Sequence, residues 1–173
     1  NAVYTPSGAD ITTGSVTLTY TTNDPSGPCG SVNAAMTLTI DPAATVSANA
    51  DQTVCVSVGT ATLNGSFGGS ASSSSWTTAG DGTFDNANLL GAVYTFGATD
   101  ITNGSVILTL TTNDPTGPCG AVSDAMTITI EALPTANANA DQNTCSAGTT
   151  TLNGIVGGGA TGGTWTTAGD GTF

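Results

Sequence analysis

The sequence AVYTFGATDITNGSVILTLTTNDPTGPCGAVSDAMTITI at residues 92–130 has a near copy at residues 2–40, which read AVYTPSGADITTGSVTLTYTTNDPSGPCGSVNAAMTLTI. Tyr4 and Tyr94 mark the offset between the copies, which is 90 positions. The stretch between them also recurs, because ADQTVC, TLNG and WTTAGDGTF in residues 50–84 return as ADQNTC, TLNG and WTTAGDGTF in residues 140–173. The chain of 173 residues is therefore a tandem repeat with slightly less than two units.

Apolar residues alternate with threonine in the most regular segments of each copy. The alternating positions are Val16, Leu18, Tyr20, Met36, Leu38 and Ile40, and then Val106, Leu108, Leu110, Met126, Ile128 and Ile130. A period of two residues predicts half-buried β-strands. Because Lys and Arg are absent and Glu is almost absent, we expect essentially no helix. Asn-Gly and Asp-Gly turn signals separate about seven short strands per unit, which is typical of a two-sheet β-sandwich.

Short segments of small residues and proline follow the two most regular strands, at residues 41–44 and 131–134. Such segments suit connections between domains, so we place the domain boundaries there. The chain then holds the C-terminal half of one domain (residues 1–40), one complete domain (41–130) and the N-terminal half of the next (131–173). We expect a piece of a longer array. The alternative is that the two halves complete each other, within one chain or between neighbouring subunits.

The predicted core of the complete domain is built from its large apolar residues at inward strand positions. These residues are Val54, Leu63, Trp76, Phe84, Tyr94, Val106, Leu108, Leu110, Met126, Ile128 and Ile130. About a dozen such residues suffice for a domain of this size.

The charge composition excludes several classes of function. The chain has no Lys, Arg or His and 12 acidic residues, which gives a formal net charge of −12 at pH 7. Without cations the chain cannot neutralise phosphates, so nucleic acids and anionic lipid surfaces are excluded as partners. Without histidine, His-dependent catalysis and His-ligated zinc are excluded as well. No apolar run is long enough to span a bilayer as a helix, so we expect no membrane insertion. The remaining enzyme class, an aspartic-acid hydrolase, needs two carboxylates that converge in a cleft, whereas the Asp-Gly-Thr runs at Asp81 and Asp170 occur once per repeat in a turn, so we expect no enzyme.

Four features occur in a fixed order in the complete unit: Trp76, the turn Gly80-Asp81-Gly82-Thr83, Tyr94, and the strand GSVILT at residues 104–109. This order resembles the W…GDGT…Y…GxVxLT pattern of PKD-like domains. The ADQTVC, TLNG and PCG phrases more narrowly resemble tandem repeats of very large secreted surface proteins of Bacteroidota, including gliding-motility adhesins. The resemblance covers the whole unit and implies tandem immunoglobulin-like (PKD-like) antiparallel β-sandwich domains. Val93 departs from the pattern, which has an aromatic residue or histidine before the tyrosine.

The resemblance and the repeat together lead to three functional hypotheses. The first is a structural repeat in the stalk or surface filament of an extracellular bacterial adhesin, where it acts as a spacer between neighbouring repeats. The second is an immunoglobulin-like module whose loops bind a glycan or a protein. The third is a self-assembling fibre subunit that half-domains of neighbouring copies complete. The sequence names no receptor.

Each repeat carries one pair of cysteines, which in an extracellular array indicates a disulfide. Two pairings compete. Cys55 with Cys119 would join the first strand of a sandwich to the loop before its last strand, and these strands run side by side in immunoglobulin-like folds. Cys29 and Cys145 would then pair within the adjacent repeats. The alternative pairs Cys29 with Cys55, across a strand, a linker and the start of the next strand. We expect the first.

Acidic residues also recur at equivalent positions of the repeat. Calcium binds to clustered carboxylates and backbone carbonyls, and it would offset the charge repulsion along an array. The calcium candidates are Asp51, Asp81, Asp114 and Asp141. The competing interpretation is that these residues form turns, in which aspartate accepts hydrogen bonds from nearby backbone N–H groups. No EF-hand spacing is present, and we expect no other cofactor.

Overall fold

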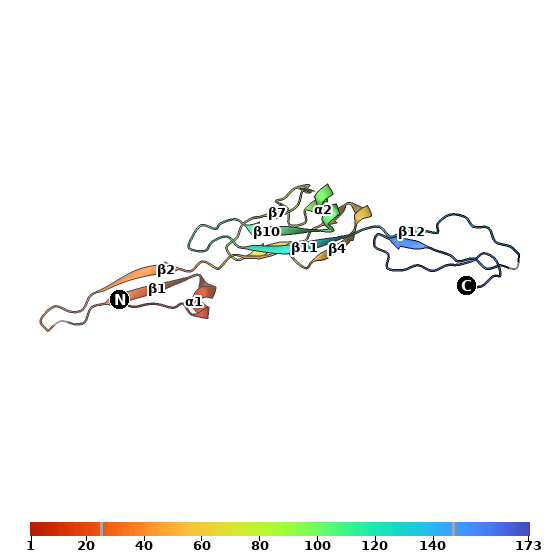
Figure 1. Ribbon diagram of the computed structural model, residues 1–173. Helices are drawn as coiled ribbons and strands as arrows, with labels where there is room; N and C mark the ends of the chain where they lie inside the picture. Colours follow the sequence, from red (N-terminus) through yellow and green to blue (C-terminus); the bar gives the residue numbers. More distant parts are fainter. Residues whose placement is uncertain (25, 147) are drawn as a thin grey trace.

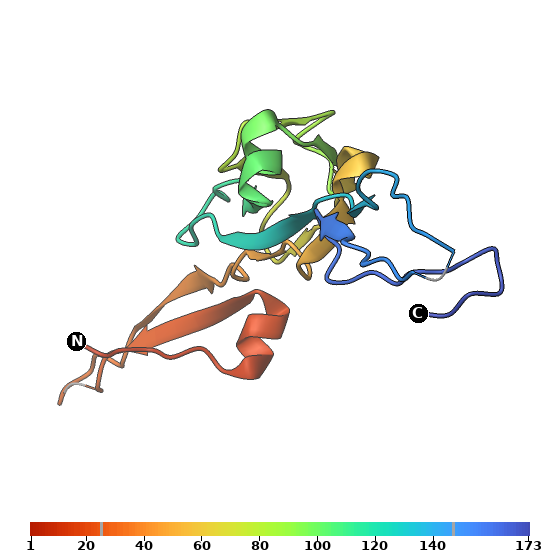
Figure 2. The same ribbon diagram turned by 45° about the vertical axis from the view of Figure 1, so that its right-hand side comes forward.

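The structure is a computed structural model that describes residues 1–24, 26–146 and 148–173. Three parts follow one another along the molecule, as Figures 1 and 2 show. The first part contains helix α1 (Gly8–Thr13) and the antiparallel hairpin of β1 (Ser15–Thr21) and β2 (Asn33–Thr39). The last part contains the antiparallel pair of β12 (Thr135–Asn137) and β13 (Ile155–Gly157). A complete sandwich lies between them.

The middle part, residues 41–130 with the end of the last strand at Glu131, forms two main sheets. One sheet has the order β4-β11-β10-β7 and the other the order β5-β9-β8, while β3 pairs with β6 beside them. The elements are β3 (Thr45–Ser47), β4 (Gln52–Cys55), the 3-10 turn η1 (Val56–Val58), β5 (Thr60–Thr62), β6 (Ser66–Gly68), β7 (Ser74–Thr78), β8 (Thr83–Phe84), β9 (Val93–Thr95), α2 (Ala98–Asn103), β10 (Ser105–Thr112) and β11 (Ser123–Glu131). The predicted all-β sandwich is thus confirmed. Its strand pairs are antiparallel except for β4 and β11, which run parallel.

The period-two pattern decides which face of each strand is buried. On β10, Val106, Leu108 and Leu110 are buried, while Ile107 between them is half exposed. Leu108 lies opposite Met126 of β11 in the ladder, so inward residues of neighbouring strands meet on one face. This arrangement follows from the alternation of side chains along a strand.

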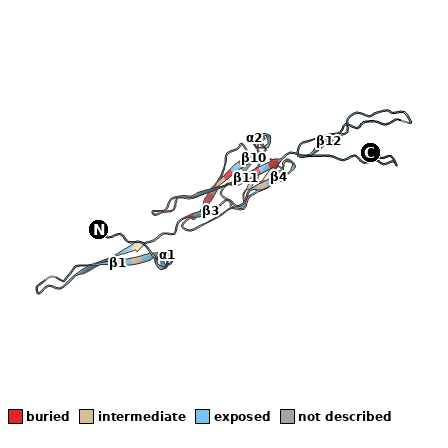
Figure 3. Ribbon diagram, turned by 60° about the horizontal axis from the view of Figure 1, so that its bottom comes forward, coloured by how far each residue is buried: buried red, intermediate tan, exposed pale blue. Residues whose placement is uncertain are grey.

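The core lies entirely in the middle part of the described chain, as the red segments of Figure 3 show. Nearly all residues of the predicted core are buried there. Val54 and Phe84 are only partly buried and pack against the core cluster. Small residues and one aromatic residue that the pattern did not predict complete it, namely Ala48, Ala61, Ala92 and Phe96.

The prediction of essentially no helix is wrong in two places, because α1 and α2 are short helices of six residues each. Both are fixed by their ends. At the start, a carboxylate three residues into the helix accepts a hydrogen bond from the backbone N–H of the N-cap residue, Asp10 from Ser7 at 2.8 Å and Asp100 from Gly97 at 3.0 Å. At the end, Gly14 and Gly104 adopt left-handed conformations with φ of 77° and 71°. Such caps stabilise a helix turn regardless of helix propensity.

Candidate functional site

The most buried acidic residue of the described chain is Asp100, which is 1% exposed. It accepts a hydrogen bond from the Tyr94 hydroxyl at 2.7 Å and one from the Gly97 N–H at 3.0 Å. The Tyr94 oxygen in turn accepts from the Gly82 N–H at 3.0 Å and lies 2.8 Å from Thr78 Oγ1. Burial raises the pKa of the Tyr94 phenol. The network therefore holds β7, β9 and α2 together and uses the polar groups that burial would otherwise leave unpaired.

The Gly-Asp-Gly turn after β7 is shaped by this network. A Cβ atom at Gly80 would lie 1.7 Å from Asp100 Oδ1, and one at Gly82 would lie 2.3 Å from the Thr95 carbonyl oxygen. Between them, Asp81 accepts hydrogen bonds from the backbone N–H of Thr99, at 3.0 and 3.1 Å, and of Asp100, at 3.3 Å. Both glycines are therefore needed for close approach, and Asp81 caps α2.

Asp81 accepts hydrogen bonds from backbone N–H groups at the start of α2, as Ser7 does at the start of α1. In α1 the hydroxyl of Ser7 accepts the hydrogen bond of the Asp10 N–H at 3.3 Å. The equivalent of Ser7 in α2 is Gly97, which has no side chain, and a Cβ atom there would lie 1.9 Å from Asp81 Oδ1. The Gly80-Asp81-Gly82 turn is thus explained by its contacts with α2 and β9.

We predict that Asp81→Asn weakens the pH dependence of stability. The Thr99 N–H lowers the pKa of the Asp81 carboxyl in the folded state. A lowered pKa means that the charged carboxylate stabilises the fold above the unfolded-state pKa of about 3.9, and that this contribution is lost as the pH falls through the folded-state value. Urea denaturation at pH 7 and at pH 3 should show a smaller difference for the variant. An unchanged difference would contradict the prediction. The matched control is Asp114→Asn, because Asp114 is exposed like Asp81 but does not lie at the start of a helix.

The four calcium candidates do not come together in one site. Asp81 caps α2, and Asp51 accepts a hydrogen bond from the Thr127 N–H at 2.8 Å. Asp114 and Asp141 are exposed, in the middle and last parts respectively. Within the described residues, no three potential ligands among Cys, Asp and Glu lie close enough to hold a metal ion. Two of the candidates thus follow the competing interpretation, in which aspartate binds backbone N–H groups.

The cysteines are free thiols, and the fold corrects the predicted pairing of Cys55 with Cys119. The strand that carries Cys55 does lie beside the last strand, because β4 pairs with β11, although β3 and not β4 is the first strand of the unit. However, Cys55 pairs with Glu131 at the far end of β11, while Val122 is bonded to Thr112 at the near end. Nine strand positions separate Val122 from Glu131, about 30 Å. Cys119 is three residues before Val122, and three residues span at most about 11 Å. The Cα atoms of Cys55 and Cys119 are therefore too far apart for a disulfide.

The alternative pairing of Cys29 with Cys55 is not formed either. Cys29 lies in the loop between β1 and β2, beyond the end of β2 that is remote from the connection at Asp41. Cys55 lies beyond β3, at the end of β4 that adjoins the next connection. The two thiols are therefore at opposite ends of successive units, and Cys29 and Cys145 are both exposed.

Instead, the structure places Cys119 against the connection that precedes the middle part. Its thiol donates to the backbone carbonyl oxygen of Asp41, with an Sγ to oxygen distance of 3.6 Å. Gly117 of the same loop lies so close that a Cβ atom there would be 2.6 Å from Asp41 Oδ2. The loop between β10 and β11 therefore contacts the junction between the first and middle parts.

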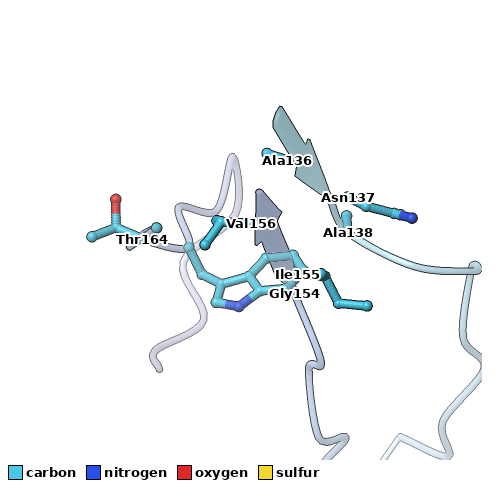
Figure 4. Close-up of a pocket in the computed structure, with 9 residues that line it drawn as sticks. Ala136, Asn137, Ala138, Gly154, Ile155, Val156 and Thr164 are labelled. Carbon is cyan, nitrogen blue, oxygen red and sulfur yellow. The ribbon is translucent and has the colours of Figure 1, made fainter. Parts of the chain in front are cut away.

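An apolar hollow of about 260 Å³ lies in the last part, and Figure 4 shows its wall. It is lined by Ala136, Asn137, Ala138, Gly154, Ile155, Val156, Gly163, Thr164 and Trp165. In the middle part the equivalent of Gly154 is Gly65, and Leu110 of β10 packs directly over it beside Trp76. In a complete unit, the space that corresponds to this hollow is therefore filled by a side chain from the C-terminal half of the unit, which is Leu110 in the middle part.

No protein-family model matches the chain, and no match was found among curated proteins. In the described part of the chain, no helix is both long and apolar enough to cross a bilayer.

Proposed function

We propose that the chain is a structural repeat of an extracellular adhesin-type stalk or surface filament, of the PKD-like, immunoglobulin-like kind found in Bacteroidota surface proteins. The observation that carries this proposal is the way in which the units connect. Strands β2 and β11 each lead through an equivalent short segment into the first strand of the next unit, β3 and β12. Units joined end to end in this way extend a molecule in one direction, as a spacer requires.

The chemistry of the described residues supports a mechanical role over a catalytic one. The buried carboxylate of Asp100 accepts hydrogen bonds from Tyr94 and Gly97, and the carboxylate of Asp81 accepts hydrogen bonds from the start of α2. Titratable groups that serve structure in this way are not available for proton transfer to a substrate. The net charge of −12 also keeps neighbouring shafts apart and soluble.

The spacer is tested with arrays of two, four and eight copies of residues 41–130. A nine-residue strand with a four-residue connection spans about 40 Å, so the contour length in electron micrographs should grow by about 40 Å per copy. Compact particles whose length does not grow with the number of copies would overturn the proposal. Binding of one isolated copy on a glycan array would instead favour the module hypothesis.

The third hypothesis, a fibre completed by half-domains, remains a second candidate because both terminal parts expose core positions. Tyr20 and Met36 are 80% and 60% exposed, whereas the equivalent Leu110 and Met126 are 0% and 1% exposed in the complete unit. The last part exposes Trp165, at the hollow described above. Residues 1–40 of one copy carry the strands that residues 131–173 of another copy lack.

Light scattering of the isolated chain tests this candidate. Association that grows with concentration and is lost in Met36→Ser would support it, because Met36 would face the completed core. The matched control is Ile107→Ser, which changes an apolar residue on the outward face of the complete unit. A chain that stays monomeric at high concentration would exclude it.

A further inference from the structure

We call the connection between the first and middle parts the first junction, and the connection between the middle and last parts the second junction. The two junctions occupy equivalent positions of the repeat, and a different cysteine lies at each of them. Asp41 at the first junction corresponds to Glu131 at the second, 90 positions later. Cys119 contacts the residue at the first junction, and Cys55 is the strand partner of the residue at the second. In a tandem array, the other cysteine at each junction would come from the neighbouring half-unit.

At the second junction, Cys55 lies on a defined side of the last strand. The Ile130 N–H donates to the Gly104 carbonyl at 2.8 Å, on the β10 side of β11. Backbone groups of successive residues in a strand point to opposite sides, so those of Glu131 point toward β4. Cys55, the parallel partner of Glu131, is on this same side.

At the first junction, Cys119 lies on the corresponding side. The Ile40 N–H donates to the Gly14 carbonyl at 2.9 Å, toward β1, so the Asp41 carbonyl points to the opposite edge. In a complete unit that edge carries the strand equivalent to β4. Because the Cys119 thiol donates to this very carbonyl, it occupies the edge where the preceding unit would place its own Cys55.

From these two half-junctions we propose that each repeat is bonded to the next by a disulfide, which links Cys55 of one unit to the cysteine at the Cys119 position of the following unit. The proposal rests on the tandem array of the proposed function. One cysteine is the lateral partner of the junction residue, and lateral neighbours in a sheet are about 4.8 Å apart. The other touches the carbonyl of the same residue on the same edge. This places the two thiols in the range of separations that a disulfide bridges without backbone movement.

The bond forms by exchange with an oxidised disulfide, of a small thiol such as glutathione or of an oxidoreductase. The Cys55 thiolate attacks one sulfur of that disulfide and releases its first thiol. The thiolate at the Cys119 position then attacks the Cys55 sulfur and releases the second. The two cysteines lose two electrons to the oxidant, and their two protons go to the released thiols. The Ser57 hydroxyl, 3.2 Å from Cys55 Sγ, lowers the pKa of the Cys55 thiol and so favours the attacking form.

The test uses the full chain extended after Phe173 by a second copy of residues 85–130, which completes the last unit. The extended chain is oxidised with glutathione disulfide, digested without reduction and analysed by mass spectrometry. We expect one major linked peptide pair, joining Cys55 to the Cys119 of the added copy. The bond should be lost in Cys55→Ser and retained in Cys29→Ser. In the chain without the extension, Cys55 should remain a thiol or a glutathione adduct.

Three outcomes would overturn the bridge. They are a Cys55 that stays open to maleimide in the oxidised, folded, extended chain, a link from Cys55 to the Cys119 of its own unit, and a link that forms only between chains. Native tryptophan fluorescence shows that the extended chain is folded. The contour length of the arrays is measured with all cysteines replaced by serine, so that it tests the spacer alone. The peptide mapping tests the disulfide alone, and the failure of one proposal can therefore be told from the failure of the other.

Discussion

Leu108→Ala is expected to lower the free energy of unfolding of the middle unit by about 3 kcal/mol. Leu108 is fully buried on the central strand β10, between Met126 of β11 and Thr78 of β7 in the ladder. Its truncation removes buried apolar surface and leaves a cavity that the flanking strands cannot close. Urea denaturation followed by the fluorescence of Trp76, in a Trp165→Phe background, measures the change.

The adjacent residue supplies the control for this prediction. Ile107 is of similar size and on the same strand, but its side chain is half exposed on the opposite face. Ile107→Ala should cost less than about 1 kcal/mol. Equal losses in the two variants would show that the period-two pattern does not decide which face packs.

Tyr94→Phe is expected to lower the free energy of unfolding of the middle unit by about 2 kcal/mol. The change removes the hydroxyl that donates to the buried Asp100 carboxylate and that accepts from the Gly82 N–H. Buried groups left without a partner carry the full cost of their desolvation, and hydrogen bonds to charged groups are the stronger kind. The same denaturation experiment measures the loss.

The repeat provides a matched control within one molecule. Tyr4 donates to Asp10 at 2.6 Å in the first part, in the same way as Tyr94 donates to Asp100, but both residues of that pair lie near solvent. Tyr4→Phe should change stability by less than about 0.5 kcal/mol, because water replaces the lost partner. A large effect there would mean that burial is not what makes the Tyr94 hydrogen bond important.

The sandwich and most of its core could be predicted because they depend on local alternation. The sequence pattern predicts that one face of this strand is buried, and in β10 the buried residues are indeed Val106, Leu108 and Leu110. Helix propensity alone does not predict α1 and α2, because their capping residues stabilise them. The recurring Asp10 and Asp100, each followed four residues later by glycine, are the capping signals that would have revealed them.

The cysteine pairing could not be predicted, because it depends on strand direction. The resemblance to immunoglobulin-like folds implies that the strand carrying Cys55 lies beside the last strand, as β4 lies beside β11. It did not indicate at which end of β11 the short strand β4 would stop. Since β4 is parallel to β11 and pairs with its last residues, Cys55 and Cys119 lie at opposite ends of the unit. A strand pairing shifted toward the start of β11 would have brought them together.

The opposite placement of Cys55 and Cys119 also sets how far a bridged array could be pulled. Tension would pass from Cys55 of one unit through the disulfide into the next unit, and would bypass most of both domains. The chain that carries load between successive bridges would be the stretch that corresponds to residues 29–55. Fully extended, these residues span about 90 Å, which is close to the roughly 80 Å of two folded units. The length of the oxidised array would therefore increase little under tension, even where its β-sandwich domains unfold.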